Sequence, residues 1–543
     1  MKRYSLAVLL LACTMMLGLS ACGTTTTPDN NLGDTEIYSI TTVENWDFSD
    51  GFYAAITPDK STHGIQYWLL NFYDTLVIRE GDEYKGNLAE RWDISDDEKS
   101  YTFHLKKDVK FSDGTALTAE AVKTSIMAAI QNLGMYAASA GKLSTILASI
   151  EAVDEVTLKI NLTAPYYGLL NDLALCYPMG IVSPKAFNED LTVKEDIMTA
   201  TFGTGPYMYA GNTDGTTYTF VKNPYYHGQD PDVDEFKIKV ISDLDATVLA
   251  LRNGEIDLIP GSTRLSFDGY KELSNADGIK TIIDSSTSNS RFMGFNVQKT
   301  PFDDLAVRQA VAFALDKETI ANTVFSSLET PATELLDKNL PYCNVQTTTY
   351  SFNVQKAKEL LENTGWIDSD NDGIREKDGK KLSVTLDYIS DQSFLDDAVL
   401  VIAQSLKDIG MNVTPRGADS YTWYTNIVKG DWEFSLHQTY GGYNDPYLTI
   451  TNMNPDLMTD PVLYQVADLL ENGKDTLLEL DTISDTDRIQ AIYDEILTTA
   501  ADQAVLIPLT YMHQYAAYNT DRINSFSFGS NQLFIEIANV KLP

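Results

Sequence analysis

The sequence predicts an α/β fold with more than one sheet. Segments in which apolar and polar residues alternate, as in a half-buried strand, recur along the chain and are interleaved with segments of helical periodicity. The chain has 543 residues, of which 43% are hydrophobic, and this is ample for a large core and too much for a single sheet. No internal repeat or low-complexity linker follows residue 35, so we expect a continuous, compact body.

Three segments carry the strand pattern most clearly. Apolar side chains alternate with polar ones at residues 101–105, 156–162 and 236–240. Because successive side chains of a strand point to opposite faces, this spacing places the apolar residues of each segment on one side of a sheet.

Helical spacing is clearest in the second half of the chain. Asp304 can cap a helix whose apolar face runs from Val307 to Leu315. Two further apolar faces, at 357–361 and 399–409, are each followed closely by a glycine that can end the helix. Strands and helices therefore mix along the sequence, as in an α/β protein.

The first residues have the pattern of a secretory signal. Lys2 and Arg3 precede an apolar stretch, Leu6–Leu19, which is shorter than the ~20 residues of a comfortable membrane span. Small residues lead to Cys22, and the segment resembles a bacterial lipoprotein signal. We therefore expect residues 1–21 to be removed; the resemblance implies that Cys22 becomes the lipid-bearing first residue.

The segment after the expected cleavage site is polar and Thr-rich. Residues 22–35 fit a flexible tether between a lipid anchor and the folded body. Together with the signal, this implies a location at the outer face of the cytoplasmic membrane or in the periplasm.

Charge and cysteine content exclude several classes of protein. A formal net charge of −37 argues against nucleic acid as a partner and against direct lipid binding by the fold. Four cysteines among 543 residues are too few for a fold that depends on disulfide bonds. Cys176 and Cys343 are the two that remain in the expected body, and the sequence leaves open whether they pair.

A long block near the first third of the chain carries a recognisable signature. Residues 88–125 contain Ala-Glu-x-Trp, Tyr-x-Phe-x-Leu and Phe-x-Asp-Gly, and end with Thr-Ala-Glu. Further blocks follow in order at 203–207, 223–226, 251–257 and 357–366. The chain resembles the family 5 extracellular solute-binding proteins, the peptide and nickel group of ABC importers, over nearly its whole mature length.

The resemblance implies a two-lobed periplasmic-binding-protein-like fold (type II, cluster C) with an extra subdomain in lobe one. It implies lobe one at 36–285, lobe two at 286–507, and a return to lobe one at 508–543. It also implies a monomer that binds a small molecule and delivers it to ABC permease subunits, with no cofactor and no catalysis of its own.

The resemblance is greatest to the nickel-binding branch, on the segment 437–447 (HQTYGGYNDPY) and the closing EIANVKLP. This implies a nickel–chelator complex as the ligand. The alternative is a short peptide, although Gly442 stands where peptide-binding members have an acidic residue for the ligand's ammonium. A cationic side chain and a His in the cleft would favour the chelate, and an acid and a base at opposite ends would favour the peptide.

Six side chains are candidates for ligand contact. Four come from the segment expected to line the cleft, one lies near the position of an arginine of the nickel branch, and one belongs to an aromatic cluster. They are His437, Tyr440, Tyr443 and Asn444, then Tyr177, then Tyr67. Tyrosines suit such a site because they combine a flat apolar face with a polar tip.

The sequence contains only weak signals for a metal site or a catalytic site. The chain has five His, no two at helical ligand spacing, so we expect no built-in metal cage. Asp368, Asp370 and Asp372 copy the start of a calcium loop, but Gly379 stands where the closing Glu belongs, so an acidic turn competes with calcium. A surface hydrolase or adhesin is a third possibility, without any nucleophile–base pair to support it.

Overall fold

The computed structural model describes residues 37–543, except 49–50, 56–63, 82, 135–140, 391–392, 440–445, 458–459, 530 and 532. The chain divides into residues 1–37 and a compact unit, Tyr38–Pro543. The expected signal peptide, Cys22 and the tether lie outside the described residues. None of the described helices is long and apolar enough to cross a membrane.

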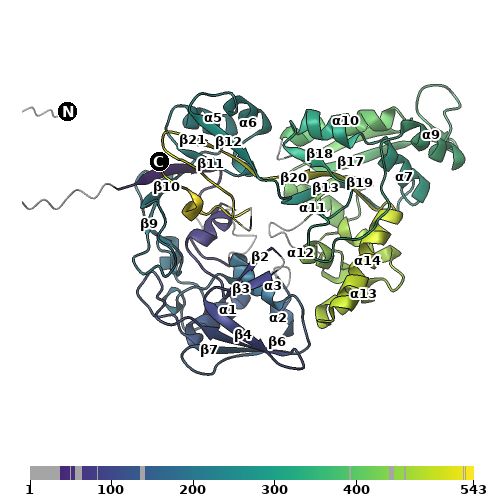
Figure 1. Ribbon diagram of the computed structural model, residues 1–543. Helices are drawn as coiled ribbons and strands as arrows, with labels where there is room; N and C mark the ends of the chain where they lie inside the picture. The colour runs from purple at the N-terminus through teal and green to yellow at the C-terminus, as the bar shows by residue number, and fades with distance from the viewer. Residues whose placement is uncertain are drawn as a thin grey trace, which may run out of the picture. The chain divides into compact units, whose positions relative to one another are not determined.

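The first large sheet has seven strands. Its order is β12-β21-β11-β1-β10-β9-β8, and β1 pairs in parallel with both β10 and β11, while the outer pairs are antiparallel. Helices α5 and α6 pack beside β11, β12 and β21 (Figure 1). The bounds are β1 (Ser39–Glu44), β8 (Tyr207–Asn212), β9 (Thr217–Lys222), β10 (Glu235–Val240), β11 (Leu258–Pro260), β12 (Ile279–Ile283), β21 (Tyr515–Asn519), α5 (Leu244–Arg252) and α6 (Phe267–Leu273).

A separate four-stranded sheet belongs to the same half of the molecule. Its order is β4-β5-β7-β6, helix α1 packs against β6 and β7, and a two-stranded hairpin, β2–β3, precedes it. The bounds are β2 (Val77–Glu80), β3 (Glu83–Gly86), β4 (Ala89–Ile94), β5 (Ser100–Leu105), β6 (Leu147–Ala152), β7 (Thr157–Leu162), α1 (Ala119–Leu133), α2 (Leu143–Ile146), α3 (Leu169–Ala174) and α4 (Cys176–Met179).

The second large sheet has six strands in the order β14-β20-β13-β19-β17-β18. Its strands are β13 (Asn289–Phe295), β14 (Glu329–Pro331), β17 (Ser383–Ile389), β18 (Asn412–Ala418), β19 (Phe434–Gln438) and β20 (Leu506–Met512), and a hairpin joins β15 (Glu376–Lys377) to β16 (Lys380–Lys381). The helices are α7 (Leu305–Ala314), α8 (Lys317–Thr319), α9 (Val354–Asn363), α10 (Ser393–Lys407), α11 (Ser420–Val428), α12 (Pro446–Thr451), α13 (Lys474–Glu479) and α14 (Thr486–Asp502).

The chain passes between the two large sheets at two places in the described part. Residues 284–288 connect β12 to β13, and residues 513–514 connect β20 to β21. At each of these two places, the strand before the connection and the strand after it lie in different sheets. The result is the two-lobed α/β architecture that the sequence analysis expects.

Local signals explain several of these elements. The Oδ1 of Asp304 accepts a hydrogen bond from the backbone N–H of Ala306 at 2.9 Å and so caps α7. Gly365 ends the turn after α9 with φ +87°, a conformation that favours glycine. The strand prediction at 101–105 is confirmed by β5, whose apolar residues are buried on one face.

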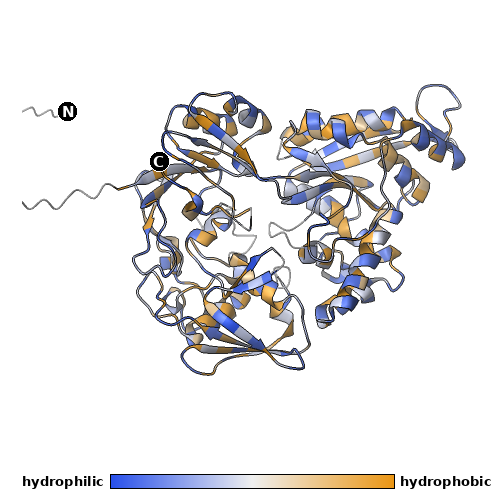
Figure 2. Cartoon of the chain, viewed as in Figure 1, coloured by the Kyte–Doolittle hydropathy of each residue, from blue (hydrophilic) through white to orange (hydrophobic). Residues whose placement is uncertain are grey.

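The core lies between the sheets and their helices. Apolar side chains of the strands and the inner helix faces are buried, while the outer faces are polar (Figure 2). Burying this apolar surface is the main favourable term in folding, at about 25 cal/mol per Å².

Candidate ligand-binding site

A cavity of about 560 Å³ is lined by residues from both halves of the fold. A volume of this size suits a small ligand. Its walls come from the first half, from crossing residues 285–287 and from the segment after β14. The lining residues are Leu70, Thr75, Ile78, Arg79, Gly81, Asn171, Ala174, Leu175, Ser285, Ser286, Thr287, Asp337, Asn339, Leu340, Pro341, Gly529, Asn531 and Phe534.

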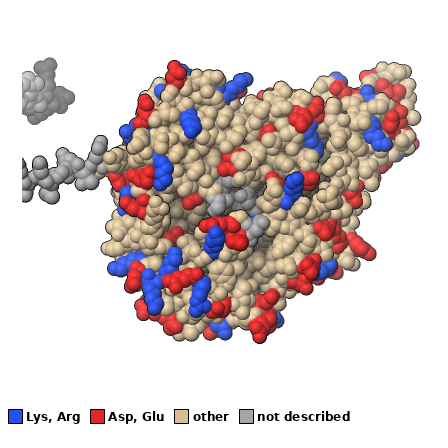
Figure 3. All heavy atoms as spheres, viewed as in Figure 1, with Lys and Arg blue, Asp and Glu red and all other residues tan. Residues whose placement is uncertain are grey.

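The cavity wall is almost neutral, although the protein is strongly acidic. Acidic and basic side chains are interspersed over the face of the molecule shown in Figure 3. Among the eighteen described residues that line the cavity, only Arg79 and Asp337 carry charge, and none is a His. The two charges have opposite sign and come from different halves of the fold.

Both charged side chains are held by local hydrogen bonds. The Nε of Arg79 donates to the carbonyl oxygen of Gly81 at 2.9 Å, in the turn between β2 and β3. The Oδ2 of Asp337 accepts from the hydroxyl of Thr287 at 2.7 Å, and its Oδ1 accepts from the backbone N–H and side-chain amide of Asn339, each at 2.9 Å. These donors to Asp337 are uncharged, so they fix the carboxylate without neutralising it.

Two acidic side chains adjoin cavity residues: Asp74 directly precedes Thr75 in the sequence, and Glu536 lies against Gly529. The carboxylate of Asp74 contacts Nε2 of His227 at 3.1 Å and accepts from the hydroxyl of Thr204 at 2.8 Å. Burial acts to raise the pKa of Asp74, but these partners outweigh it and hold the pKa below its ordinary value. The Oε1 of Glu536 fills the space that a Cβ at residue 529 would need. Burial, and then the charge of Asp74, raise the pKa of Glu536.

His437 is packed inside the second half of the fold. Its Nε2 lies 2.8 Å from the Oδ2 of Asp460, and its ring lies 4.9 Å from that of Trp423 and 5.3 Å from that of Phe292. Only 7% of the side chain is exposed. His437 is not among the residues that line the cavity.

The other predicted contacts are dispersed. Tyr67 stacks on Trp46 and lies under the guanidinium of Arg264, 4.8 Å from ring centre to Cζ. Tyr177 packs against the core of the first half, and burial raises the pKa of its hydroxyl. Neither lines the cavity, and the structure does not bring them together with His437. Tyr440, Tyr443 and Asn444 lie outside the described residues.

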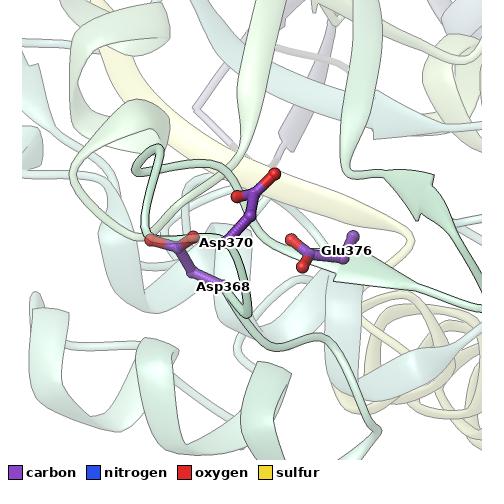
Figure 4. Close-up of side chains that lie close together, drawn as sticks. All are labelled: Asp368, Asp370 and Glu376. Carbon is purple, nitrogen blue, oxygen red and sulfur yellow. The ribbon is translucent and has the colours of Figure 1, made fainter.

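The acidic loop after α9 differs from the expected calcium set. Oxygens of Asp368, Asp370 and Glu376 lie within 4.8 Å of one another (Figure 4). Asp372 is not in this group. The ammonium of Lys381 lies 2.7 Å from Asp370, 2.9 Å from Asp372 and 3.6 Å from Glu376, so a side-chain cation already compensates these carboxylates.

Cys176 and Cys343 are both buried free thiols. The disulfide that the sequence left open is not formed. Burial raises the pKa of Cys176 well above its ordinary value, which makes it an inert core residue.

Two α/β lobes joined by crossing segments, with a cavity lined from both, define the class of two-lobed binding proteins for small solutes. The chain matches the model of the bacterial extracellular solute-binding proteins, family 5, over residues 83–456. It belongs to this family. Members of the family are substrate-binding proteins of ABC transporters, not enzymes, and this chain is the solute-binding protein of an ABC importer.

Individual relatives fall into two groups. The chain is 30% identical to the nickel-binding periplasmic protein of Escherichia coli (strain K12) over 427 residues, which cover 78% of this chain and 80% of that protein. It is 26% identical to the oligopeptide-binding protein AppA of Bacillus subtilis (strain 168) over 547 residues, 95% of each. The crystal structure of NikA from Brucella suis in complex with Fe(III)-EDTA superposes with a TM-score of 0.85 at 27% identity, covering 93% of this chain and all of that one.

Sequence reasoning missed the two charged residues of the cavity. Arg79 lies in an ordinary strand before a Gly turn, and Asp337 lies in a loop, so neither spacing nor composition distinguishes them from other surface charges. Only the fold brings them to one cavity.

Proposed function

We propose that this protein captures a complex of nickel with a small organic chelator and delivers it to a membrane permease. The observation that carries the proposal is the likeness to a nickel-binding protein at 30% identity over most of both chains. The NikA structure, which contains a metal held by an organic chelator, supports it. The metal is cargo here, and the chelator supplies its ligands.

The cavity chemistry is compatible with a chelate. A guanidinium can bind a carboxylate through two parallel hydrogen bonds, and Arg79 offers this group to the carboxylates of a chelator. Asp337 would then face the positively charged part of the complex. Tyr440, Tyr443 and Asn444 remain candidates for stacking and hydrogen bonding, and we assign His437 the role of supporting the segment that carries them.

The N-terminal sequence supports a lipid-anchored form. We propose cleavage after residue 21, a lipid on Cys22 and a tether over residues 22–35, which place the binding lobes at the outer face of the cytoplasmic membrane or in the periplasm. We propose that the protein acts as a monomer. We also propose the lobe boundaries 36–285, 286–507 and 508–543.

A short peptide is the second candidate ligand, and one observation favours it. The cavity offers a base and an acid on walls from different halves of the fold, which matches the two charged ends of a peptide. A ligand that carries both charges can interact favourably with both groups, whereas a singly charged ligand can interact favourably with only one of them. The peptide-binding relatives are consistent with this alternative.

A thermal-shift comparison distinguishes the two candidates. The protein from residue 23 onward, which keeps the whole compact unit, is mixed with nickel and L-histidine, with nickel alone, with L-histidine alone, and with di- to pentapeptides. A ligand at about 100 times its dissociation constant stabilises the folded protein by about 2.7 kcal/mol. Stabilisation only by nickel and histidine together supports the chelate. Stabilisation by peptides alone replaces it with the second candidate.

A further inference from the structure

A buried ion pair connects the two lobes. The Nζ of Lys142 lies 2.8 Å from the Oδ2 of Asp481, and the two side chains are only 7% and 16% exposed. Lys142 immediately precedes α2, beside the four-stranded sheet, whereas Asp481 lies between α13 and α14 of the other lobe. The contact therefore exists only while the lobes are close together.

Both partners of this pair are fixed by further hydrogen bonds. The Oδ2 of Asp172 accepts from the backbone N–H groups of Lys142 and Leu143, at 2.9 and 3.0 Å, and so holds the start of α2. The hydroxyl of Tyr447 donates to the Oδ1 of Asp481 at 3.3 Å. An ion pair held in one geometry discriminates strongly between arrangements of the lobes, even where its net stabilisation is small.

Aromatic rings pack beside the ion pair on the side of Asp481. The ring of Tyr167 lies edge-on to that of Tyr447, with centroids 5.4 Å apart, and its backbone N–H donates to the carbonyl of Ile483 at 3.1 Å. Tyr447 is 4% exposed and is part of the core cluster of the first lobe, although it comes from α12 of the second. Figure 1 shows α3, which follows Tyr167, next to α12.

The residues around this ion pair, here called the cluster, are adjacent in sequence to residues that line the cavity. Asn171, a cavity residue, directly precedes Asp172, and Pro341, another cavity residue, directly precedes Tyr342, whose ring packs on Tyr167. Crossing residues 285–287 form another part of the cavity wall. A movement that separates the cluster therefore moves walls of the cavity that belong to both lobes.

We propose that Lys142, Tyr167, Tyr447 and Asp481 form an interlobe latch that holds the lobes together without ligand. The rings stabilise the closed form by burying apolar surface, and the ion pair favours one relative orientation of the two lobes in that form. Because the apparent dissociation constant equals the intrinsic one divided by the fraction of competent, closed protein, the latch lowers the closing penalty for any ligand. Removing one charge leaves the other buried without its partner, which favours the open form.

The test measures the distance between the lobes in ligand-free protein, so it does not depend on which ligand binds. Spin labels are placed at Val153→Cys and Leu400→Cys, which are 59% and 61% exposed on different lobes, in the protein from residue 23 onward. Cys176 and Cys343 are buried and stay unlabelled. We expect a short-distance population in the parent, and a fall of roughly tenfold in the ratio of closed to open protein in Asp481→Asn and in Lys142→Met.

Control variants keep the result interpretable. Lys474→Met removes the exposed Lys474–Asp456 pair of the second lobe and should leave the distances unchanged. Lys142→Met combined with Asp481→Leu removes both charges together and should restore the short distance. Tyr447→Leu tests the ring independently, if a charge variant fails to fold by circular dichroism. An open parent, or folded latch variants whose distances match the parent, would overturn the proposal.

Discussion

The Nε2 of His437 and the Oδ2 of Asp460 lie 2.8 Å apart, and both side chains are almost fully buried. Asp460 also accepts hydrogen bonds from the backbone of Val462 and Leu463. The pair thus ties the end of β19 to the chain after α12, on either side of the segment expected to contact the ligand. A side chain that the sequence predicts as a ligand contact has the surroundings of a structural residue.

Replacing His437 should affect stability more than binding. His437→Ala removes the partner of a buried carboxylate and the ring between Trp423 and Phe292, so we expect a loss of about 1–3 kcal/mol in the free energy of unfolding. Urea denaturation measures this loss. Ligand affinity within about twofold of the parent is expected; a large loss of affinity at unchanged stability would restore His437 to the ligand site.

Arg79 should contact the ligand directly and contribute to its affinity. Arg79→Gln removes the charge but keeps hydrogen-bonding groups, and we expect binding of nickel–histidine to weaken by about tenfold or more, measured by isothermal titration calorimetry. The control is Lys85→Gln, which removes the same charge from an exposed position on the same hairpin. Equal effects of the two variants would mean that net charge, not contact, is responsible.

Asp337→Asn separates the two candidate ligands. A peptide ammonium needs the carboxylate, so peptide binding should fall by about tenfold, whereas a chelate whose metal charge is already compensated should lose less. The amide is nearly isosteric with the carboxylate: its oxygen can keep the bonds from Asn339, and its NH2 group can donate to the hydroxyl of Thr287 where the carboxylate accepted from it. Titration of both ligands with the same variant gives the comparison.

Glu536 should make stability depend on pH. Burial, and then the charge of Asp74, raise its pKa in the folded protein above the ordinary value of 4.5. Its contribution to stability is therefore complete below pH 4.5 and is lost as the pH rises through the folded pKa. Glu536→Gln should raise the melting temperature at pH 7 relative to the parent and have little effect at pH 4. A variant that is less stable at pH 7 would contradict this assignment.

Calcium should not stabilise the parent protein. Lys381 already compensates Asp370 and Asp372, so a divalent ion would have to displace its ammonium. We expect no resolvable change in melting temperature with calcium in the parent, and a rise in Lys381→Met, where the carboxylates lose their cation. A rise in the parent equal to that in the variant would show that the ion and Lys381 do not compete.

Local patterns in the sequence predict the elements well, because period and capping are local properties. The alternation at 236–240 and the cap at Asp304 both appear in the structure as expected. The cavity could not be predicted in the same way. Arg79 and Asp337 are 258 positions apart, and only the sheet order and the crossing segments bring them to one cavity. His437 shows the opposite error. The sequence predicts it as a ligand contact because it begins the segment expected to line the cleft, but in the structure its side chain is buried.

Retention of nickel on gel filtration tests the central claim most directly. The protein from residue 23 onward is loaded with nickel in the presence or absence of L-histidine, and the metal that co-elutes is measured by mass spectrometry. We predict about one nickel per chain with histidine and almost none without it. Nickel retained equally in both samples, or in neither while a peptide pool is retained, would contradict the proposed function.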